Sequence, residues 1–177
     1  MTTHPTTPAA LQPNHPIPGF ALPDTDGAIV RLVSFKQRRP VLLALLHRAA
    51  CPDCRGWLAQ LAATGDELAY LCVQPLLIFP DSPATLRTLR DELRLPGALL
   101  SDPAGETHAR YLGAEAEPGR SPHQSVLLVA VGRYNELLAA WEASEPSGWP
   151  PLAESFATFA FAEQEDCACG LPVWPDA

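Results

Sequence analysis

A continuous apolar run that ends in two closely spaced cysteines restricts the fold more than any other part of the sequence. Residues 40–47 read PVLLALLH, and residues 48–55 read RAACPDCR. An apolar run of this length is typical of a strand that is buried on both faces of a parallel sheet. Because proline is favoured at the first position of a helix, we predict that a helix starts at Pro52. Cys51 and Cys54 then lie where a central strand passes into a helix.

The rest of the chain supplies the elements of one α/β domain. Short apolar segments and turn or helix-start signals alternate along it. They predict a hairpin over 20–32, strands over 75–80 and 98–101, helices after Pro83 and Pro103, a hairpin over 126–141 and a last helix over 152–160. Strands joined by helices run parallel, so we expect a central mixed sheet flanked by helices, with an N-terminal β-hairpin extension. Catalytic groups in such sheets gather at the carboxyl ends of the strands.

Composition restricts the class of protein. With 177 residues, 47% of them hydrophobic, the chain fits one domain with its own core. We expect a flexible tail over 1–16, the domain over 17–163 and a cysteine-bearing tail over 164–177. A formal charge of −8 argues against nucleic acid, and the absence of a long apolar run or a signal-like start argues against a membrane. We therefore expect a cytoplasmic protein, in which five cysteines indicate redox or metal chemistry.

The position of the two cysteines favours thiol–disulfide chemistry. The N-terminus of a helix stabilises a thiolate, which identifies Cys51 as the nucleophile and Cys54, one turn later, as the resolving thiol. Pro52 stiffens the turn between them. The side chains of His47, Arg48 and Arg55 can carry positive charge and favour the thiolate. The carboxylate of Asp53, inside the motif, opposes it.

Three segments together resemble the alkyl hydroperoxide reductase/thiol-specific antioxidant family of the thioredoxin-like superfamily. They are PGFALPDTDG at 18–27, HRAACPDCR at 47–55 and LSDPAG at 100–105. The resemblance implies a thioredoxin-like fold and a redox-active centre. Peroxidases of this family carry Pro and then Thr or Ser before the reactive cysteine, where this chain has Ala44 and Arg48, which argues against peroxide as the natural oxidant. Pro122 is the candidate for the cis-proline that faces the dithiol in such proteins, and an ordinary trans proline is the alternative.

A second cysteine pair, Cys167 and Cys169, lies close to the end of the sequence. One interpretation is a strained, easily reduced disulfide that relays electrons to or from the first pair. Another places Cys51, Cys54, Cys167 and Cys169 around Zn²⁺ or an iron–sulfur centre. The third gives the second pair no function. Cys72 is expected to be buried, and neither His108 nor His123 lies in a sequence signature for a cysteine hydrolase.

The sequence therefore predicts an enzyme of the thiol–disulfide oxidoreductase class that uses the Cys51/Cys54 dithiol and contributes to cell redox homeostasis. Its expected partner is a protein disulfide or dithiol, or a small thiol, and no cofactor is expected. The alternatives are a thiol peroxidase with antioxidant activity and a non-catalytic, metal-binding relative.

Overall fold

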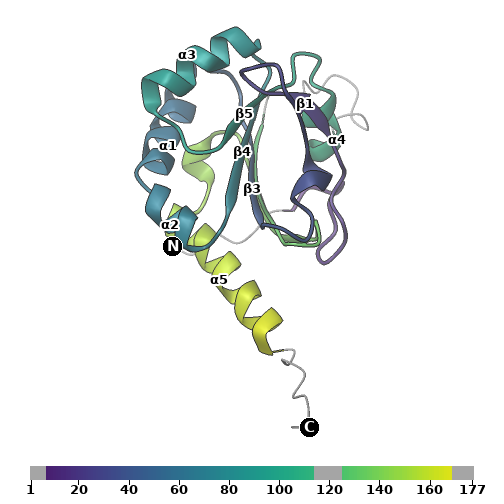
Figure 1. Ribbon diagram of the computed structural model, residues 1–177. Coiled ribbons are helices and arrows are strands. Elements are labelled where there is room, and N and C mark those ends of the chain that lie inside the picture. The colour runs from purple at the N-terminus through teal and green to yellow at the C-terminus, as the bar shows by residue number, and fades with distance from the viewer. Residues whose placement is uncertain (1–6, 114–124, 169–177) are drawn as a thin grey trace, which may run out of the picture.

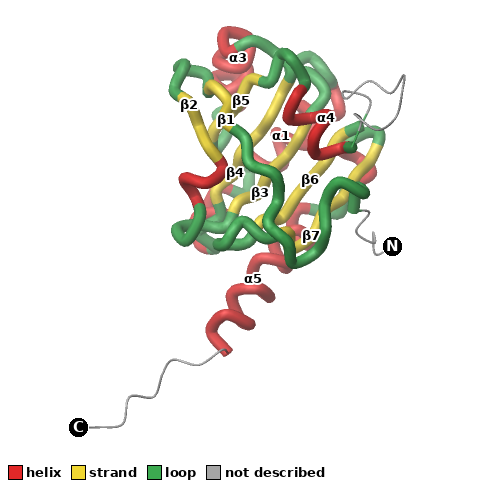
Figure 2. Tube along the Cα trace, turned by 90° about the vertical axis from the view of Figure 1, so that its right-hand side faces the viewer, coloured by secondary structure: helices red, strands yellow, loops and turns green. Residues whose placement is uncertain are grey.

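A computed structural model describes residues 7–113 and 125–168, with side chains through residue 162. Its centre is a five-stranded mixed sheet (Figure 1) with the order β5-β4-β3-β6-β7, whose strands are labelled in Figure 2. Strands β3, β4 and β5 are parallel, β6 is antiparallel to β3, and β7 is antiparallel to β6. The strands are β3 (Val41–Leu45), β4 (Gln74–Phe79), β5 (Ala98–Ser101), β6 (Val126–Val131) and β7 (Leu137–Ala143). This confirms the α/β class and the mixed sheet expected from the sequence.

Helices and extended segments cover the two faces of the sheet (Figures 1 and 2). One face packs against α1 (Pro52–Ala62), α2 (Gly65–Tyr70), α3 (Pro83–Leu93), the 3-10 helix η3 (Pro146–Gly148) with the residues after it, and α5 (Leu152–Ala168). The other face packs against α4 (Glu106–Leu112), the two-stranded hairpin β1 (Ala21–Pro23) and β2 (Ile29–Arg31), and the 3-10 helix η1 (Leu32–Phe35). No helix in the described ranges is both long enough and apolar enough to cross a membrane.

Strand β3 is apolar throughout because both of its faces are buried. Leu42 and Ala44 belong to the core under α1 and α3, whereas Leu43 and Leu45 belong to the core under α4 and the hairpin. All four are fully buried. Side chains alternate between the faces of a strand, so a strand with a core on each side has no polar position. This explains why residues 40–47 form a continuous apolar run and do not alternate between apolar and polar residues.

The helices that follow β3 and β4 start where the sequence predicts. Cys51 is the cap residue of α1, and Pro52 is the first helical residue. Ser82 caps α3, its hydroxyl accepting the backbone N–H of Thr85 at 3.3 Å. Each helix follows the carboxyl end of a strand after a short turn, which brings both helix N-termini to one edge of the sheet.

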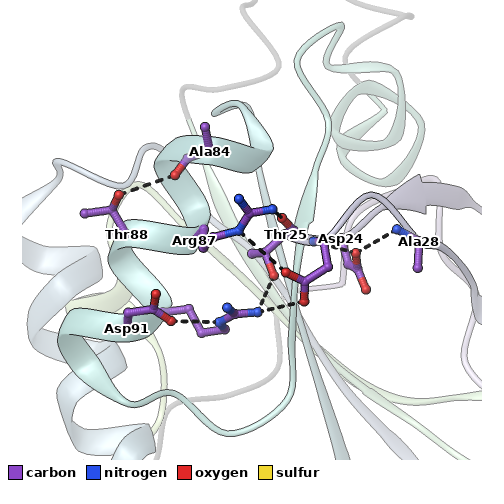
Figure 3. Close-up of polar contacts among 9 residues, drawn as sticks. Asp24, Thr25, Ala28, Ala84, Arg87, Thr88 and Asp91 are labelled. Atoms are coloured by element: carbon purple, nitrogen blue, oxygen red, sulfur yellow. Dashed lines mark hydrogen bonds and ion pairs between the residues drawn. The ribbon is translucent and has the colours of Figure 1, made fainter.

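The N-terminal hairpin is attached to α3 by side-chain hydrogen bonds (Figure 3). The Asp24 carboxylate accepts the backbone N–H of Ala28 at 2.9 Å and so closes the turn. From α3, Arg87 donates to the carbonyl of Thr25, and Arg90 donates to the Thr25 hydroxyl at 2.6 Å. The hairpin is thus fixed beside the edge of the sheet that carries the helix starts.

Two expectations about individual segments were wrong. The described part of the predicted tail, from residue 7, packs onto the domain, with Leu11 only 4% exposed. The amide of Asn14 donates to the Leu137 carbonyl, and the Leu137 amide donates to the His15 carbonyl. A single buried leucine and backbone pairing attach this Pro- and Thr-rich segment without any periodic pattern. Cys72, expected to be buried, is exposed and has a left-handed backbone (φ 53°) in the turn before β4.

Candidate functional site

The turn that carries Cys51 is fixed by contacts with its neighbours. It follows β3, and the amide of Ala49 donates to the Asp81 carboxylate at 2.9 Å. Within the turn, the Cys51 amide donates to the Arg48 carbonyl at 3.0 Å. Asp81 follows β4. A residue at the carboxyl end of β4 therefore positions the turn that follows the neighbouring strand β3.

Cys51 and Cys54 differ in exposure although both lie at the start of α1. The Cys51 side chain is half-buried, and its sulfur accepts the amide of Cys54 at 3.5 Å. The free N–H groups and the dipole of a helix N-terminus stabilise negative charge at this place. Cys54 is fully buried, and this burial raises its pKa to about 12, with a further contribution from the adjacent Cys51. One sulfur therefore faces solvent at a helix cap while the other is enclosed behind it.

His47 lies against both sulfurs. Its Nδ1 is 3.9 Å from the Cys51 Sγ and 4.0 Å from the Cys54 Sγ. The three atoms all lie within 4.8 Å of one another. An imidazole in this place can exchange a proton with either thiol, and it can also share a metal ion with them. The sequence predicts His47 only as a nearby charge, although His47 lies four residues before Cys51.

The charged residues of the motif are exposed or form contacts with other residues. Arg48 is exposed. Arg55 forms an ion pair with Glu92 of α3 at 2.7 Å and donates to the Ala49 carbonyl at 3.4 Å. Asp53 and Pro52 are exposed on the first turn of α1. Arg55 thus holds the turn against α3, with its charge balanced by Glu92.

A buried acid–histidine pair supports the end of β3. His108, fully buried on α4, places Nδ1 2.8 Å from the Asp102 Oδ2 and Nε2 3.1 Å from the Leu46 carbonyl. The same Asp102 oxygen accepts the amides of Thr107 and His108. Both ring nitrogens therefore lie within hydrogen-bond distance of an oxygen acceptor, and the Asp102 carboxylate is one of the two acceptors. His108 bonds to Leu46, the residue before His47, and its pairing with Asp102 was missed by sequence reasoning.

A pocket of about 390 Å³ lies beside the dithiol, between the outer side of α1 and the segment around η3. Pro52, Asp53 and Trp57 line it from α1, and Trp149 lines it from the other side. The two indoles meet edge to face, with ring centroids 4.9 Å apart. The pocket reaches Pro52, the residue next to Cys51.

Several predicted site residues lie outside the described part of the chain. Pro122 and His123 belong to the segment 114–124, and Cys169 follows the last described residue. Cys167 lies in α5 by its backbone, and its side chain is outside the description. The cis-proline and the second redox pair therefore stay predictions.

A protein-family model described as the AhpC/TSA family matches residues 13–130 of the 177. The chain belongs to the AhpC/TSA family. The match includes His47, both cysteines of the dithiol and the Asp102–His108 pair, and it confirms the resemblance seen in the sequence.

Two curated relatives come from Mycobacterium tuberculosis strains CDC 1551 and H37Rv, and each is named "Putative peroxiredoxin". Each is 33% identical over 96 residues. The matched part is 54% of this chain and only 60% of the length of each relative. The likeness therefore leaves a large part of each protein without a counterpart.

Solved structures share the fold. The peroxidoxin BcpB of Mycobacterium tuberculosis has a TM-score of 0.72 at 18% identity, with 85% of this chain and 97% of that one covered. A thiol peroxidase from Chromobacterium violaceum has a TM-score of 0.70 at 22% identity, covering 91% and 93%. A secreted disulfide oxidoreductase of Mycobacterium tuberculosis has a TM-score of 0.58 at 17% identity, covering 80% and 95%. These likenesses confirm the thioredoxin-like fold.

Proposed function

We propose that this member of the AhpC/TSA family is a cytoplasmic thiol–disulfide oxidoreductase that uses the Cys51/Cys54 dithiol. The observation that carries the proposal is the position of both sulfurs: Cys51 at the cap of α1, and Cys54 behind it with its amide 3.5 Å from the Cys51 Sγ. A half-buried thiolate at a helix N-terminus is a nucleophile, and a buried thiol one turn later is placed to resolve the product.

The reaction proceeds in two exchanges. The Cys51 thiolate attacks one sulfur of a substrate disulfide, the substrate S–S bond breaks, and the first substrate thiolate leaves. Cys54 then loses its proton to His47, whose Nδ1 lies 4.0 Å away, and attacks the Cys51 sulfur. The second substrate thiolate leaves as the Cys51–Cys54 disulfide forms. Two electrons pass from the dithiol to the substrate, and a protein dithiol or small thiol returns them.

The test uses a chain in which Cys72, Cys167 and Cys169 are replaced by serine, so that only the dithiol reacts. The reduced protein is mixed with a chromogenic aromatic disulfide, and the released thiolate and the protein mass are measured. We expect two thiolates per chain and an internal disulfide. Cys54→Ser should release one thiolate and stop at a mixed disulfide, because no second thiol resolves it. If Cys51→Ser releases as much thiolate as the parent, Cys51 is not the nucleophile.

A thiol peroxidase is the second candidate, favoured by family membership and by the names of the curated relatives. Here the Cys51 thiolate attacks hydrogen peroxide, forming a sulfenic acid and hydroxide, and Cys54 condenses with it to release water. The same chain with only Cys51 and Cys54 serves as the test. Peroxide consumption sustained by a thiol reductant, and abolished in Cys51→Ser, would establish this activity. Consumption no faster than in Cys51→Ser would exclude it and leave disulfide exchange as the function.

A further inference from the structure

His47, Cys51 and Cys54 together form a donor set for a metal ion. Two thiolates and one imidazole are soft-to-borderline ligands, which favour Zn²⁺ over Ca²⁺ or Mg²⁺. We infer that the reduced chain binds one Zn²⁺ through His47 Nδ1, Cys51 Sγ and Cys54 Sγ, with the fourth coordination position open. This set differs from the four-cysteine arrangement that the sequence left as an alternative, because the His47 imidazole takes the place of Cys167 and Cys169.

The distances fit a tetrahedral ion after a small contraction. Zn²⁺ binds sulfur at about 2.3 Å and histidine nitrogen at about 2.0 to 2.1 Å, which places the two ligand atoms about 3.6 Å apart in a tetrahedron. The observed N–S distances are 3.9 and 4.0 Å. Each pair therefore has to close by only about 0.3 to 0.4 Å. All three pairs of ligand atoms already lie within 4.8 Å.

The three ligands are presented by well-supported backbone. The Leu46 carbonyl, directly before His47, accepts from His108. The turn before Cys51 is held by Asp81, and Cys54 lies in α1. Because His47 and Cys51 are only half-buried, an ion can enter from solvent, while Cys54 binds it from the enclosed side. Such preorganisation lowers the cost of ordering ligands around an ion.

Metal binding and disulfide formation exclude each other at this site. Zn²⁺ replaces the protons of the two thiols, and a Cys51–Cys54 disulfide leaves the ion with His47 alone. The oxidised chain should therefore release the ion. A bound Zn²⁺ should in turn block the attack of Cys51 on a disulfide, a consequence that rests on the proposed function, whereas binding itself requires no turnover.

The test titrates the tag-free, reduced full chain with Zn²⁺ in native mass spectrometry and with Co²⁺ in absorption spectroscopy. We expect one ion per reduced chain and none in the oxidised chain. Co²⁺ should give thiolate charge-transfer bands and the strong visible bands of a tetrahedral site. Loss of an outer-shell partner alone weakens metal binding by about 10- to 100-fold, so His47→Ala should weaken it by more than about 100-fold. Circular dichroism checks that this variant is folded, and His47→Gln repeats the test with less loss of volume.

Two control variants separate this site from its rivals. Cys72→Ser, in an exposed turn, and the double variant Cys167→Ser/Cys169→Ser should bind as the parent does. Binding that survives in folded His47→Ala, or that is lost in the double variant, would overturn the proposed ligand set. No binding by the reduced parent at micromolar free Zn²⁺ would also overturn it. If Zn²⁺ binds while the chain exchanges no disulfide, the redox proposal falls and the metal site stands.

Discussion

At the scale of single residues, the contrast between Cys51 and Cys54 gives a first prediction. Burial raises the pKa of Cys54 to about 12, so this thiol stays protonated at the pH of ordinary handling. Iodoacetamide reacts with thiolates and needs access to the sulfur. We expect Cys54 to be alkylated at least about tenfold more slowly than the exposed Cys72, with the rate rising as the pH approaches 12.

Peptide mapping of the reduced chain by mass spectrometry measures each site separately. Cys51, half-buried at the helix cap, should be modified before Cys54. Equal rates at Cys54 and Cys72 near neutral pH would contradict the enclosed position of Cys54. The comparison is made within one molecule, so unfolding of the sample would be visible as a loss of the difference.

The buried pair of Asp102 and His108 gives a second residue-scale prediction. Asp102→Ala removes the carboxylate that the His108 ring faces and leaves two backbone amides without their acceptor. Each buried polar group that is left without its partner costs about 1 to 3 kcal/mol of unfolding free energy. Urea unfolding measures this loss. The control is Asp91→Ala, whose exposed ion pair with Arg90 should contribute much less to stability than the buried pair. Similar losses of unfolding free energy in the two variants would show that the buried pair stabilises the fold no more than an exposed pair does.

At the scale of the elements, local patterns predicted most of the fold. The apolar run at 40–47, Pro52 at a helix start and the turn before Ala28 each act over a few residues, and the structure confirms all three. Local sequence patterns do not predict contacts between residues that are far apart in the chain. His108 meets Leu46 across 62 residues because α4 folds under β3, and no local pattern records that approach.

The candidate site shows the same division. The sequence identified both cysteines because their spacing and helix start are local. It did not give the burial of Cys54 or the pairing of Arg55 with Glu92, because both depend on how α3 packs beside α1. The distance from His47 to each sulfur depends in turn on the path of the chain between β3 and α1.

The turn between β3 and α1 gives an element-scale prediction. Asp81→Ala removes the acceptor of the Ala49 amide, and a buried unpaired group costs about 1 to 3 kcal/mol. We expect this loss in urea unfolding, together with a changed alkylation rate at Cys51, since the turn positions its sulfur. Asp81→Asn keeps one acceptor oxygen and should lose less. If Asp81→Ala changes neither stability nor the rate at Cys51, the contact does not hold the turn.

At the scale of the whole molecule, the sheet separates two cores. The segment before the hairpin, from residue 7 to Ile17, covers part of the core that lies under α4 and the hairpin. Strand β7 is an edge strand, and edges with free backbone groups tend to pair with other chains. Here the backbone of Asn14, His15 and Ile17 bonds around the start of β7. Leu11 anchors this segment in the core beneath α4. The segment thus contributes both apolar burial and cover for an edge.

Leu11→Ala tests the role of this segment. Removing a buried leucine side chain costs about 2 to 5 kcal/mol, so urea unfolding should show a loss in this range. Val33→Ala is the control, because Val33 is 62% exposed and its truncation should change stability by less than about 0.5 kcal/mol. Since release of the segment uncovers the start of β7, light scattering of Leu11→Ala should also show more association than the control. An unchanged unfolding midpoint would mean that the segment before the hairpin does not contribute to the stability of the domain.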